Sequence, residues 1–524
     1  MTRKNRHEFD VLVIGSGIAG LSAAVTAAER GLSVGVITKE RDVLESNTRY
    51  AQGGIVGPSV DDTKELLEND IIFAGAELNF ADAVRLLVRE GPKLVESFLA
   101  GKIGVPFTTD EAGKPALTRE AAHSVRRILY AQDQTGEAIE RALHIYAQKT
   151  KGIEFFPGHT AVDLITNTHN STDPQEKYRK SHVFGAYVFS EETEHVSAFF
   201  SPMVILAAGG VGNLFLHTSN PVGATGDGIA MAYRIGAEIL NAEYVQFHPT
   251  VLFHRDFKRF LISEALRGEG ARLINQQGEY FMKRYSPENG DLAPRDEVAR
   301  AIYREMERED VGYMRLDATG ITELSVEERF PAIYEKCFSL GIDITKEAIP
   351  VVPAAHYFCG GVKVDLDGRT GIDGLFAAGE NACTGIHGAN RLASVSLLEG
   401  LYWGVRCVEQ AVDTAIPLSE KLMRSVADWI EPKVVEEFDP VLLNQDFKSI
   451  QSTMWNYAGI IRSRKRLIRA MADLSYLSHR IEQFYRGGPI TRRSIELRNS
   501  VLAASIIVRA ALQNPVSRGC HYIE

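Results

Sequence analysis

Apolar and helical patterns alternate at the start of the chain. Residues 9–14 (FDVLVI) are nearly all apolar, residues 18–30 carry small and apolar side chains at helical spacing, and residues 32–38 (LSVGVIT) are again mostly apolar. Short apolar runs of this kind are typical of parallel strands with both faces buried. The pattern predicts a strand, a helix that ends before Gly31 and a second strand, arranged as in a βαβ unit.

Two further strand-like runs, each followed by glycine, lie far downstream. They are residues 203–210 (MVILAAGG) and 374–385 (GLFAAGENACTG). A single sheet that begins near residue 10 and ends near residue 376 must be interrupted by insertions. Segment 242–356 mixes helical runs with short strands and is predicted to be an inserted domain. From residue 417 onward the pattern is mostly helical, with helices predicted over 421–438, 458–485 and 492–512.

Three glycines directly after the first strand indicate a dinucleotide-binding turn. Gly15, Gly17 and Gly20 form GxGxxG between the predicted strand and helix. The first permits a tight turn, the second lets the backbone approach a pyrophosphate, and the third lets the helix pack on the strand. The acidic residue that usually binds the ribose should end the second strand. Residues 38–40 (TKE) stand there, so the pattern leaves this contact open.

The interrupted sheet favours a flavoprotein over a compact NAD domain, because FAD is long and needs several loops. The predicted fold class is α/β. A Rossmann-like FAD-binding domain, residues 1–241 and 357–416, is interrupted by an α+β capping domain, residues 242–356. A C-terminal helical domain, residues 417–524, follows. Three domains agree with a length of 524 residues.

Composition and charge narrow the function classes. The net charge of -10 does not suggest a nucleic-acid-binding protein, and no run of about 20 uncharged apolar residues predicts a membrane helix. The five cysteines, at positions 337, 359, 383, 407 and 520, form no CxxC and no metal-ligand spacing. We therefore expect no metal, no disulfide framework and a reducing cytoplasmic location.

Several histidines and arginines lie in short motifs rich in glycine, proline and small residues. Taken singly, such a histidine is more often a structural residue and such an arginine more often lies on a solvated face. Loops with few surface charges around them are better suited to line a site. Arginine binds carboxylates with two N–H groups and histidine adds a donor, so the set indicates a site for a dianion. The residues are His248, Ser263, Glu264, Arg267, Glu269, Arg295, His356, His387 and Arg391.

Ordered motifs along the chain resemble the succinate dehydrogenase/fumarate reductase flavoprotein family. They are GSGIAGL, AQGG, GDGIAMAYRIGAE, QFHPT, LRGEGARL, PRDEVARAI, AHYFCGGV, GLFAAGE and HGANRLASVSLLE. Within the family, TREAAHS (118–124) and SRGCH (517–521) resemble the branch that oxidises L-aspartate, whose members carry TREGGHS and SRGxH there. Ala121 and Ala122 stand in place of the two glycines.

The resemblance implies a set of FAD contacts. Lys39 becomes the preferred contact on the ribose side, while Asp227 and Glu380 would face cofactor hydroxyls. The full set is Gly15, Ser16, Gly17, Ile18, Ala19, Gly20, Lys39, Ser46, Asn47, Thr48, Ala51, Gln52, Gly53, Gly54, Val162, Asp227, Glu380, Ser396 and Leu397. Asn47 stands where membrane-complex relatives carry the histidine that binds flavin covalently. An amide cannot form that bond, so we expect non-covalent FAD.

The resemblance also implies roles around the substrate. His248, Ser263, His356 and Arg391 would bind its carboxylates. Arg295 would deliver a proton to the reacting carbon in fumarate reduction, with Glu264 and Arg267 refilling it. Glu120, from the TREAAHS segment, would face the substrate ammonium, which is costly to bury without a partner.

The implied reaction is hydride transfer from L-aspartate to flavin N5, with dioxygen or fumarate as acceptor and iminoaspartate as product. In family members this oxidation is the first step toward NAD, and its product passes to quinolinate synthase. We expect no nucleic-acid or membrane partner and a monomer or weak homo-oligomer.

Two alternatives stay open: a fumarate reductase or succinate dehydrogenase flavoprotein, and a non-catalytic FAD-binding or tRNA-modification partner protein. Asn47 and Glu120 disfavour the first, and the arginine and histidine set disfavours the second.

Overall fold

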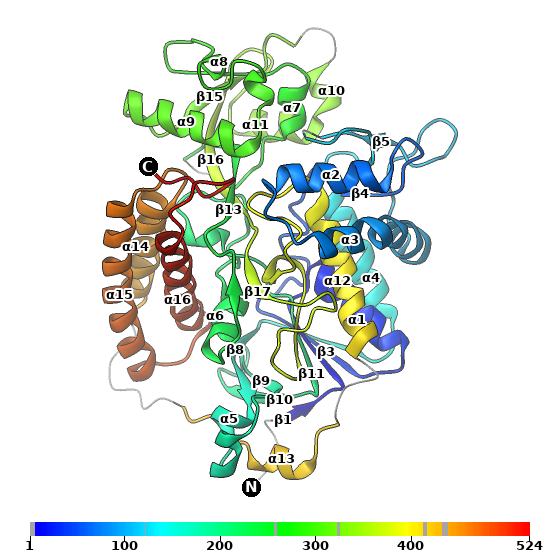
Figure 1. Ribbon diagram of the computed structural model, residues 1–524, viewed down its shortest axis with the longest axis vertical. Helices are drawn as coiled ribbons and strands as arrows, with labels where there is room; N and C mark the ends of the chain where they lie inside the picture. Colours follow the sequence, from blue (N-terminus) through cyan, green and yellow to red (C-terminus); the bar gives the residue numbers. More distant parts are fainter. Residues whose placement is uncertain (1–5, 121, 256–258, 322–324, 412–416, 432–438) are drawn as a thin grey trace.

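A five-stranded parallel sheet organises the first part of the chain (Figure 1). Its strand order is β18-β11-β2-β3-β7, and all neighbours pair in parallel. The strands are β2 (Val11–Ile14), β3 (Val34–Thr38), β7 (Ile153–Pro157), β11 (Met203–Leu206) and β18 (Leu375–Ala377). The four strands expected from the apolar runs are therefore confirmed, although each is shorter than its run.

Helix α1 (Ile18–Glu29) packs on this sheet and beside α12 (Val395–Ala411) (Figure 1). Residues 18–28 of α1 are all buried, because one side of the helix meets the sheet and the other meets α12. The helix is accordingly apolar all round, as expected for a helix with no solvated face.

Smaller elements complete this unit. A four-stranded sheet has the order β1-β10-β9-β8, and three-stranded sheets have the orders β12-β17-β19 and β4-β6-β5. Their strands are β1 (Arg6–Glu8), β4 (Ile55–Val56), β5 (Leu117–Thr118), β6 (Ile128–Leu129), β8 (His159–Thr166), β9 (Val183–Ser190), β10 (Val196–Phe200), β12 (Ile239–Leu240), β17 (Gly361–Lys363) and β19 (Ala382–Cys383). The helices are α2 (Lys64–Ala74), α3 (Ala81–Leu94), α4 (Thr135–Lys149), α5 (Asn167–Asn170) and α6 (Asp227–Arg234).

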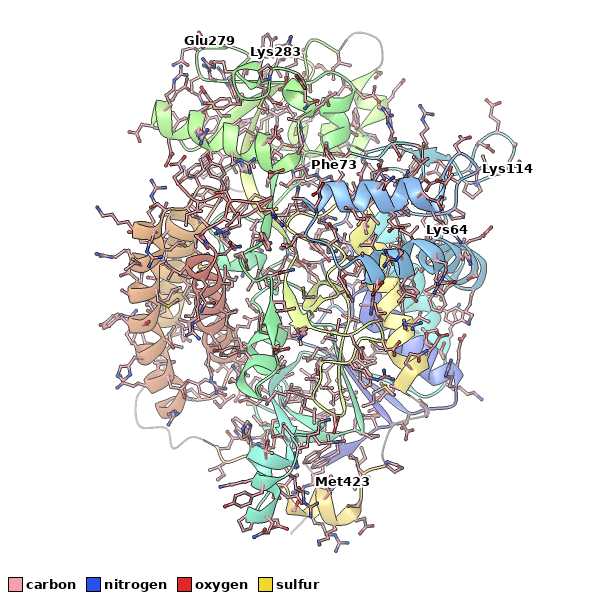
Figure 2. The ribbon with its side chains drawn as sticks, in the orientation of Figure 1. Lys64, Phe73, Lys114, Glu279, Lys283 and Met423 are labelled. Atoms are coloured by element: carbon pink, nitrogen blue, oxygen red, sulfur yellow. The ribbon has the colours of Figure 1, made fainter. Side chains whose placement is uncertain are left out.

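The inserted segment forms a cap at one end of the molecule (Figure 1). Its antiparallel sheet has the order β13-β16-β15-β14, and its two longest strands, β13 and β16, pair with each other and lead into and out of the cap. The elements are β13 (Val245–Leu252), β14 (Arg272–Ile274), β15 (Met314–Asp317), β16 (Ile349–Phe358), α7 (Glu264–Gly268), α8 (Met282–Tyr285), α9 (Arg295–Glu309), α10 (Val326–Arg329) and α11 (Pro331–Ser339). Glu279 and Lys283 mark the outer end of the cap in Figure 2.

Three long helices form the C-terminal unit: α14 (Pro440–Ala458), α15 (Arg464–Gly487) and α16 (Arg492–Gln513). Helix α16 lies against α6 and thereby joins this unit to the FAD-binding fold. The sequence prediction of a helix over 421–438 is wrong in its described part. Helix α13 (Glu420–Ser425) ends after six residues, because Val426 forms a β-bridge to Ser171 instead of continuing the helix.

The computed structural model describes residues 6–120, 122–255, 259–321, 325–411, 417–431 and 439–524. Three predicted parts lie outside these residues: Ala121, the end of the predicted FAD-binding domain at 412–416, and residues 432–438 of the predicted helix 421–438. The α/β fold with an inserted α+β cap and a helical C-terminal unit is confirmed. The residue boundaries of the domains stay a prediction.

Candidate functional site

A cavity of about 840 Å³ lies between the first βα turn and the cap. This volume falls in the upper part of the range of ligand pockets. Its lining draws on the FAD-binding fold, on cap residues such as His248 and Arg295, and on the segment that leads into α12. The predicted residues that line it are Gly15, Ser16, Gly17, Ile18, Ala19, Lys39, Ser46, Asn47, Thr48, Ala51, Gln52, Gly53, Gly54, Glu120, Asp227, His248, Ser263, Glu264, Arg295, His356, Glu380, Arg391, Ser396 and Leu397.

Three predicted residues lie behind this lining. A Cβ on Gly20 would stand 2.0 Å from the Gly15 carbonyl oxygen, so Gly20 serves the packing of helix on strand. Val162 is fully buried next to Ala161, which does line the cavity. Arg267 is buried behind Glu264.

The turn after β2 has the geometry that a dinucleotide needs. Gly15 has φ +117°, and a Cβ there would stand 2.0 Å from the Ala207 carbonyl oxygen. Gly17, the residue before α1, has no side chain to cap the helix, the Ile18 N–H donates to Thr48 Oγ1 at 3.0 Å, and no acidic residue stands in the first turn. The helix N-terminus, with its partial positive charge, therefore faces a lining that a phosphate can enter.

The loop around Asn47 offers unpaired acceptors to a ligand. Asn47 Nδ2 donates to Glu380 Oε2 at 2.5 Å. Asn47 Oδ1 and Gln52 Oε1 are buried without a hydrogen-bond partner among the described residues. Buried polar atoms are normally paired, so these two call for a ligand with donors. The N–H and hydroxyl groups of FAD fit this requirement.

Glu380 carries an unusual pKa. Burial raises it to about 7, against the hydrogen bonds from Phe358 N–H and Asn47. The carboxyl therefore ionises near neutral pH in the folded apoprotein but near its ordinary value when unfolded. Between these two pKa values the folded state binds the proton more tightly, so stability falls as pH rises through this window.

We expect Glu380→Gln to make the apoprotein less sensitive to pH. From pH 5 to pH 8 the unmodified chain should lose roughly 2–3 kcal/mol of stability through this group. The variant lacks that loss, so its melting temperature relative to the unmodified apoprotein should rise across this range. Thermal scans of both apoproteins at pH 5 and pH 8 test this, and parallel pH curves would exclude Glu380 as the source.

An ion network lies at the end of β3, where the ribose contact was left open. Lys39 Nζ lies 2.5 Å from Asp227 Oδ2 and 3.0 Å from Glu496 Oε1. Asn499 Nδ2 donates to Asp227 Oδ1 at 2.8 Å. Glu40 instead pairs with Arg492. Glu496, Asn499 and Arg492 all lie on α16, so the helical unit supports this end of the cavity, which no local pattern could have indicated.

Two neutral histidines face the cap side of the cavity. Burial and the charge of Arg295 lower the pKa of His248 well below 6.5, and burial and Arg391 do the same for His356. The Thr250 N–H donates to His248 Nδ1 at 3.2 Å, so the neutral ring carries its proton on Nε2. That Nε2 is buried without a partner among the described residues and is thus an available donor. His356 Nδ1 lies 2.7 Å from Ser219 Oγ.

Arg391 is a buried cation with no acidic partner among the described residues. Its Nε donates to Gln246 Oε1 at 3.2 Å and its Nη1 to Ser396 Oγ at 2.7 Å. Within the described part of the chain no carboxylate lies within 4.0 Å of it, so its charge is left for a ligand. Ser263 caps α7 by accepting from Ala265 N–H at 3.3 Å, which leaves its hydroxyl proton free to donate.

Arg295, Glu264 and Arg267 form a connected row. Arg295 Nε lies 2.6 Å from Glu264 Oε2, and Arg267 Nη2 lies 4.0 Å from the same oxygen. Burial alone would raise the pKa of Glu264, but Arg295 and Arg267 hold it below its ordinary value. Glu264 and Glu120 likewise raise the pKa of Arg295 against the effect of burial. The cavity thus has a charged arginine at its wall, joined to an ionised carboxylate and a second arginine.

Glu120 lines the same cavity as these cations. Ser394 Oγ donates to Glu120 Oε2 at 2.7 Å. Gly53 makes room for the carboxylate, because a Cβ there would lie 2.2 Å from Glu120 Oε1. The electrostatic influence of Glu120 reaches both Arg295 and Arg391.

Other candidates from the sequence are not at the cavity. His387 is buried and bonds to Glu399 and Tyr357 instead of lining the wall. Glu269 is exposed and pairs with Arg329 at 3.6 Å. The sequence interpretation missed Ser219, Gln246, Tyr357 and Ser394. Gln246, Tyr357 and Ser394 had a local signal, since they lie within the QFHPT, AHYFCGGV and HGANRLASVSLLE motifs, whereas Ser219 lies in none of the quoted motifs.

Comparison with known proteins gives the family. A family model described as FAD binding domain matches residues 10–397, and one described as Fumarate reductase flavoprotein C-term matches residues 447–524. The L-aspartate oxidase of Acinetobacter baylyi is 43% identical over 519 residues, which cover 98% of this chain and 93% of that relative. The L-aspartate oxidase of Yersinia pestis is 43% identical over 528 residues, covering 100% and 97%. The chain belongs to the L-aspartate oxidase family.

Solved structures place this aspartate oxidase family member within the wider flavoprotein family inferred from its motifs. A structure of E. coli quinol fumarate reductase superposes with a TM-score of 0.87 at 27% identity, over 99% of this chain and 92% of that chain. The relatives thus confirm both the fold class and the family resemblance. In the described residues no helix is long and apolar enough to span a membrane.

Proposed function

We propose that this chain oxidises L-aspartate to iminoaspartate with FAD as the hydride acceptor, the first step of NAD biosynthesis. The observation that carries the proposal is the distribution of charge in the cavity. Arg295, Arg391 and two neutral histidines form an anion-binding wall, and Glu120 provides one carboxylate in the same cavity, anchored by the Ser394 hydroxyl. L-Aspartate combines two carboxylates with one ammonium and matches this arrangement.

Each polar group of the substrate has a complementary group in the protein. His248 Nε2 and the Ser263 hydroxyl supply donors on the cap side. Arg391, which has no acidic partner among the described residues, supplies a positive charge in the same cavity. Glu120 pairs with the ammonium and so favours aspartate over dicarboxylates that lack it. When bound, FAD supplies the acceptor for the Cα hydride at N5.

Fumarate would use the same anion-binding wall as electron acceptor, and dioxygen is the alternative acceptor. Reduction of fumarate needs a proton at carbon, which Arg295 is placed to give. An arginine is charged at ordinary pH, so it must regain the proton at once. Glu264, 2.6 Å away, and Arg267 behind it are the groups for this return.

Anaerobic titration of the FAD-loaded protein tests the proposal. Aspartate should bleach the flavin absorbance within the mixing time or shortly after, whereas succinate should perturb the spectrum without bleaching it. Added fumarate should then restore the colour. Bleaching by succinate but not by aspartate would instead assign the protein as a fumarate reductase or succinate dehydrogenase flavoprotein. No response to either would favour a non-catalytic FAD-binding protein.

We expect the FAD to be held non-covalently. Asn47 stands at the position of the flavin-linking histidine, and its amide nitrogen already donates to Glu380. Precipitation of the holoprotein with acid should release essentially all the flavin into the supernatant, measured by its absorbance. Flavin that stays with the washed pellet would contradict this expectation.

The proposal includes the fate of the product, the location of the protein and its partners. Iminoaspartate is unstable in water, so an enzyme such as quinolinate synthase must consume it promptly. We expect a cytoplasmic protein that is a monomer or a weak homo-oligomer, with no nucleic-acid or membrane partner.

A further inference from the structure

The positive charge of Arg391 is buried, and its hydrogen bonds to neutral groups do not offset the cost of removing that charge from water. No carboxylate of the described residues lies within 4.0 Å of its guanidinium. Removing a charge from water without compensation is costly. A carboxylate partner would remove this cost but would also occupy the N–H groups that a ligand carboxylate needs. The protein therefore requires an attraction that leaves those N–H groups free.

The ring of Tyr357 provides such an attraction. The Arg391 Cζ lies 4.7 Å from the centre of the Tyr357 ring. A guanidinium over an aromatic face gains about 0.5–1 kcal/mol in exposed sites and about 2 kcal/mol or more when desolvated. A cation–ring contact uses none of the guanidinium N–H groups, so those that Gln246 and Ser396 leave unbonded stay available, and both residues line the cavity.

A buried group of polar side chains fixes the ring in this position. The Tyr357 hydroxyl donates to Glu399 Oε2 at 2.8 Å, and His387 Nε2 lies 2.9 Å from the same oxygen. Thr384 Oγ1 donates to Glu399 Oε1 at 2.6 Å. The His387 ring also stands edge-on to Tyr357, with centroids 5.0 Å apart.

The hydrogen bond that the Tyr357 hydroxyl donates to Glu399 strengthens the contact between the Tyr357 ring and Arg391. Burial, together with the charge of Glu399, raises the pKa of Tyr357 well above 10, so the phenol stays neutral and is the donor. A phenol that donates to a carboxylate has a more electron-rich ring, which attracts a cation more strongly.

We propose that Tyr357 is a positioning residue that holds Arg391 charged, unpaired and oriented toward the substrate carboxylate, and that Glu399 and His387 hold Tyr357 for this purpose. The inference rests on the proposed role of Arg391 as a carboxylate ligand. It gives His387, which the sequence suggested as a site residue, a part in the site through Tyr357.

A double-mutant cycle on the FAD-loaded protein tests the inference, with succinate as probe and the flavin spectrum as readout. Tyr357→Leu should raise the succinate Kd about tenfold or more, which corresponds to about 1.4 kcal/mol. In the Arg391→Gln background the same change should raise it less than about twofold, because coupled residues act non-additively. Tyr357→Phe, which keeps the ring, should cost less than about threefold.

Tyr402→Leu is the matched control. Tyr402 is also buried, also faces an arginine, Arg406 at 6.0 Å, and does not line the cavity, so its loss should leave the succinate Kd unchanged. For aspartate, Tyr357→Leu should raise KM by about the same factor as the succinate Kd and lower kcat much less. If Tyr357→Leu does not retain FAD, Glu399→Gln takes its place in the double-mutant cycle. Glu399→Gln should raise the succinate Kd about threefold in the protein with Arg391 and should leave it unchanged in the Arg391→Gln background.

Additive effects of the Tyr357 and Arg391 changes, or a Tyr357→Phe effect as large as that of Tyr357→Leu, would overturn the inference. The experiments distinguish an error in the role of Tyr357 from an error in the proposed function. A protein that does not oxidise aspartate but shows the non-additive succinate pattern would retain this role for Tyr357 in dicarboxylate recognition. A protein that oxidises aspartate with additive effects would lose only the role of Tyr357.

Discussion

Arg295→Leu is expected to lower the rate of fumarate reduction by about a thousandfold or more. Loss of a positioned proton donor typically costs 10²–10⁴-fold. The change also leaves Glu264 buried without its closest partner, which lies at 2.6 Å in the unmodified chain. The rate of flavin reoxidation by fumarate under anaerobic conditions measures the effect directly.

Arg295→Lys and Arg308→Leu are the matched controls for this prediction. The lysine keeps a positive charge near Glu264 and should restore part of the activity. Arg308 lies on the same helix α9, pairs with Glu305 at 3.4 Å and is half exposed, so its loss should leave the rate unchanged. If Arg295→Leu retained rapid fumarate reduction, the proton would have to come from another group and the Arg295–Glu264–Arg267 row would be a structural feature only.

Glu120→Gln is expected to weaken aspartate use far more than fumarate use. Removing one member of a buried charge pair costs about 2–5 kcal/mol, which is about 30- to 5,000-fold in kcat/KM for aspartate. Fumarate has no ammonium and should lose less than about threefold. Glutamine keeps an oxygen that can accept from the Ser394 hydroxyl, so the local packing should be preserved.

The comparison of the two substrates decides the role of Glu120. Steady-state kcat/KM for aspartate and for fumarate are measured on the same preparation with its bound FAD quantified. Glu111→Gln, an exposed change in the same part of the chain, serves as the control. Equal losses for both substrates would show that Glu120 supports the shape of the cavity and does not pair with the ammonium.

The N-terminal βαβ unit was predictable because its signal is local. Buried parallel strands require apolar runs, and the turn at Gly15, with φ +117°, requires a residue without Cβ. The same holds for the cap, whose paired strands β13 and β16 carry His248 and His356 within recognisable motifs. The helix predicted over 421–438 failed for the opposite reason. Its pattern was helical, but a non-local bridge from Val426 to Ser171 ended it.

The sequence by itself determined the fold class, the family and the residue types that meet at the cavity, since these depend on periodicity and short motifs. Only the tertiary structure decided how their charges are distributed. It joined Lys39 to Asp227 and to Glu496 of a distant helix, and Arg295 to Glu264, while it left Arg391 facing the ring of Tyr357 with no acidic partner in the described part of the chain. The reason is physical: the environment of a buried charge depends on which groups lie within a few ångströms of it. Residues far apart in the chain supply those groups, and no local pattern records their proximity.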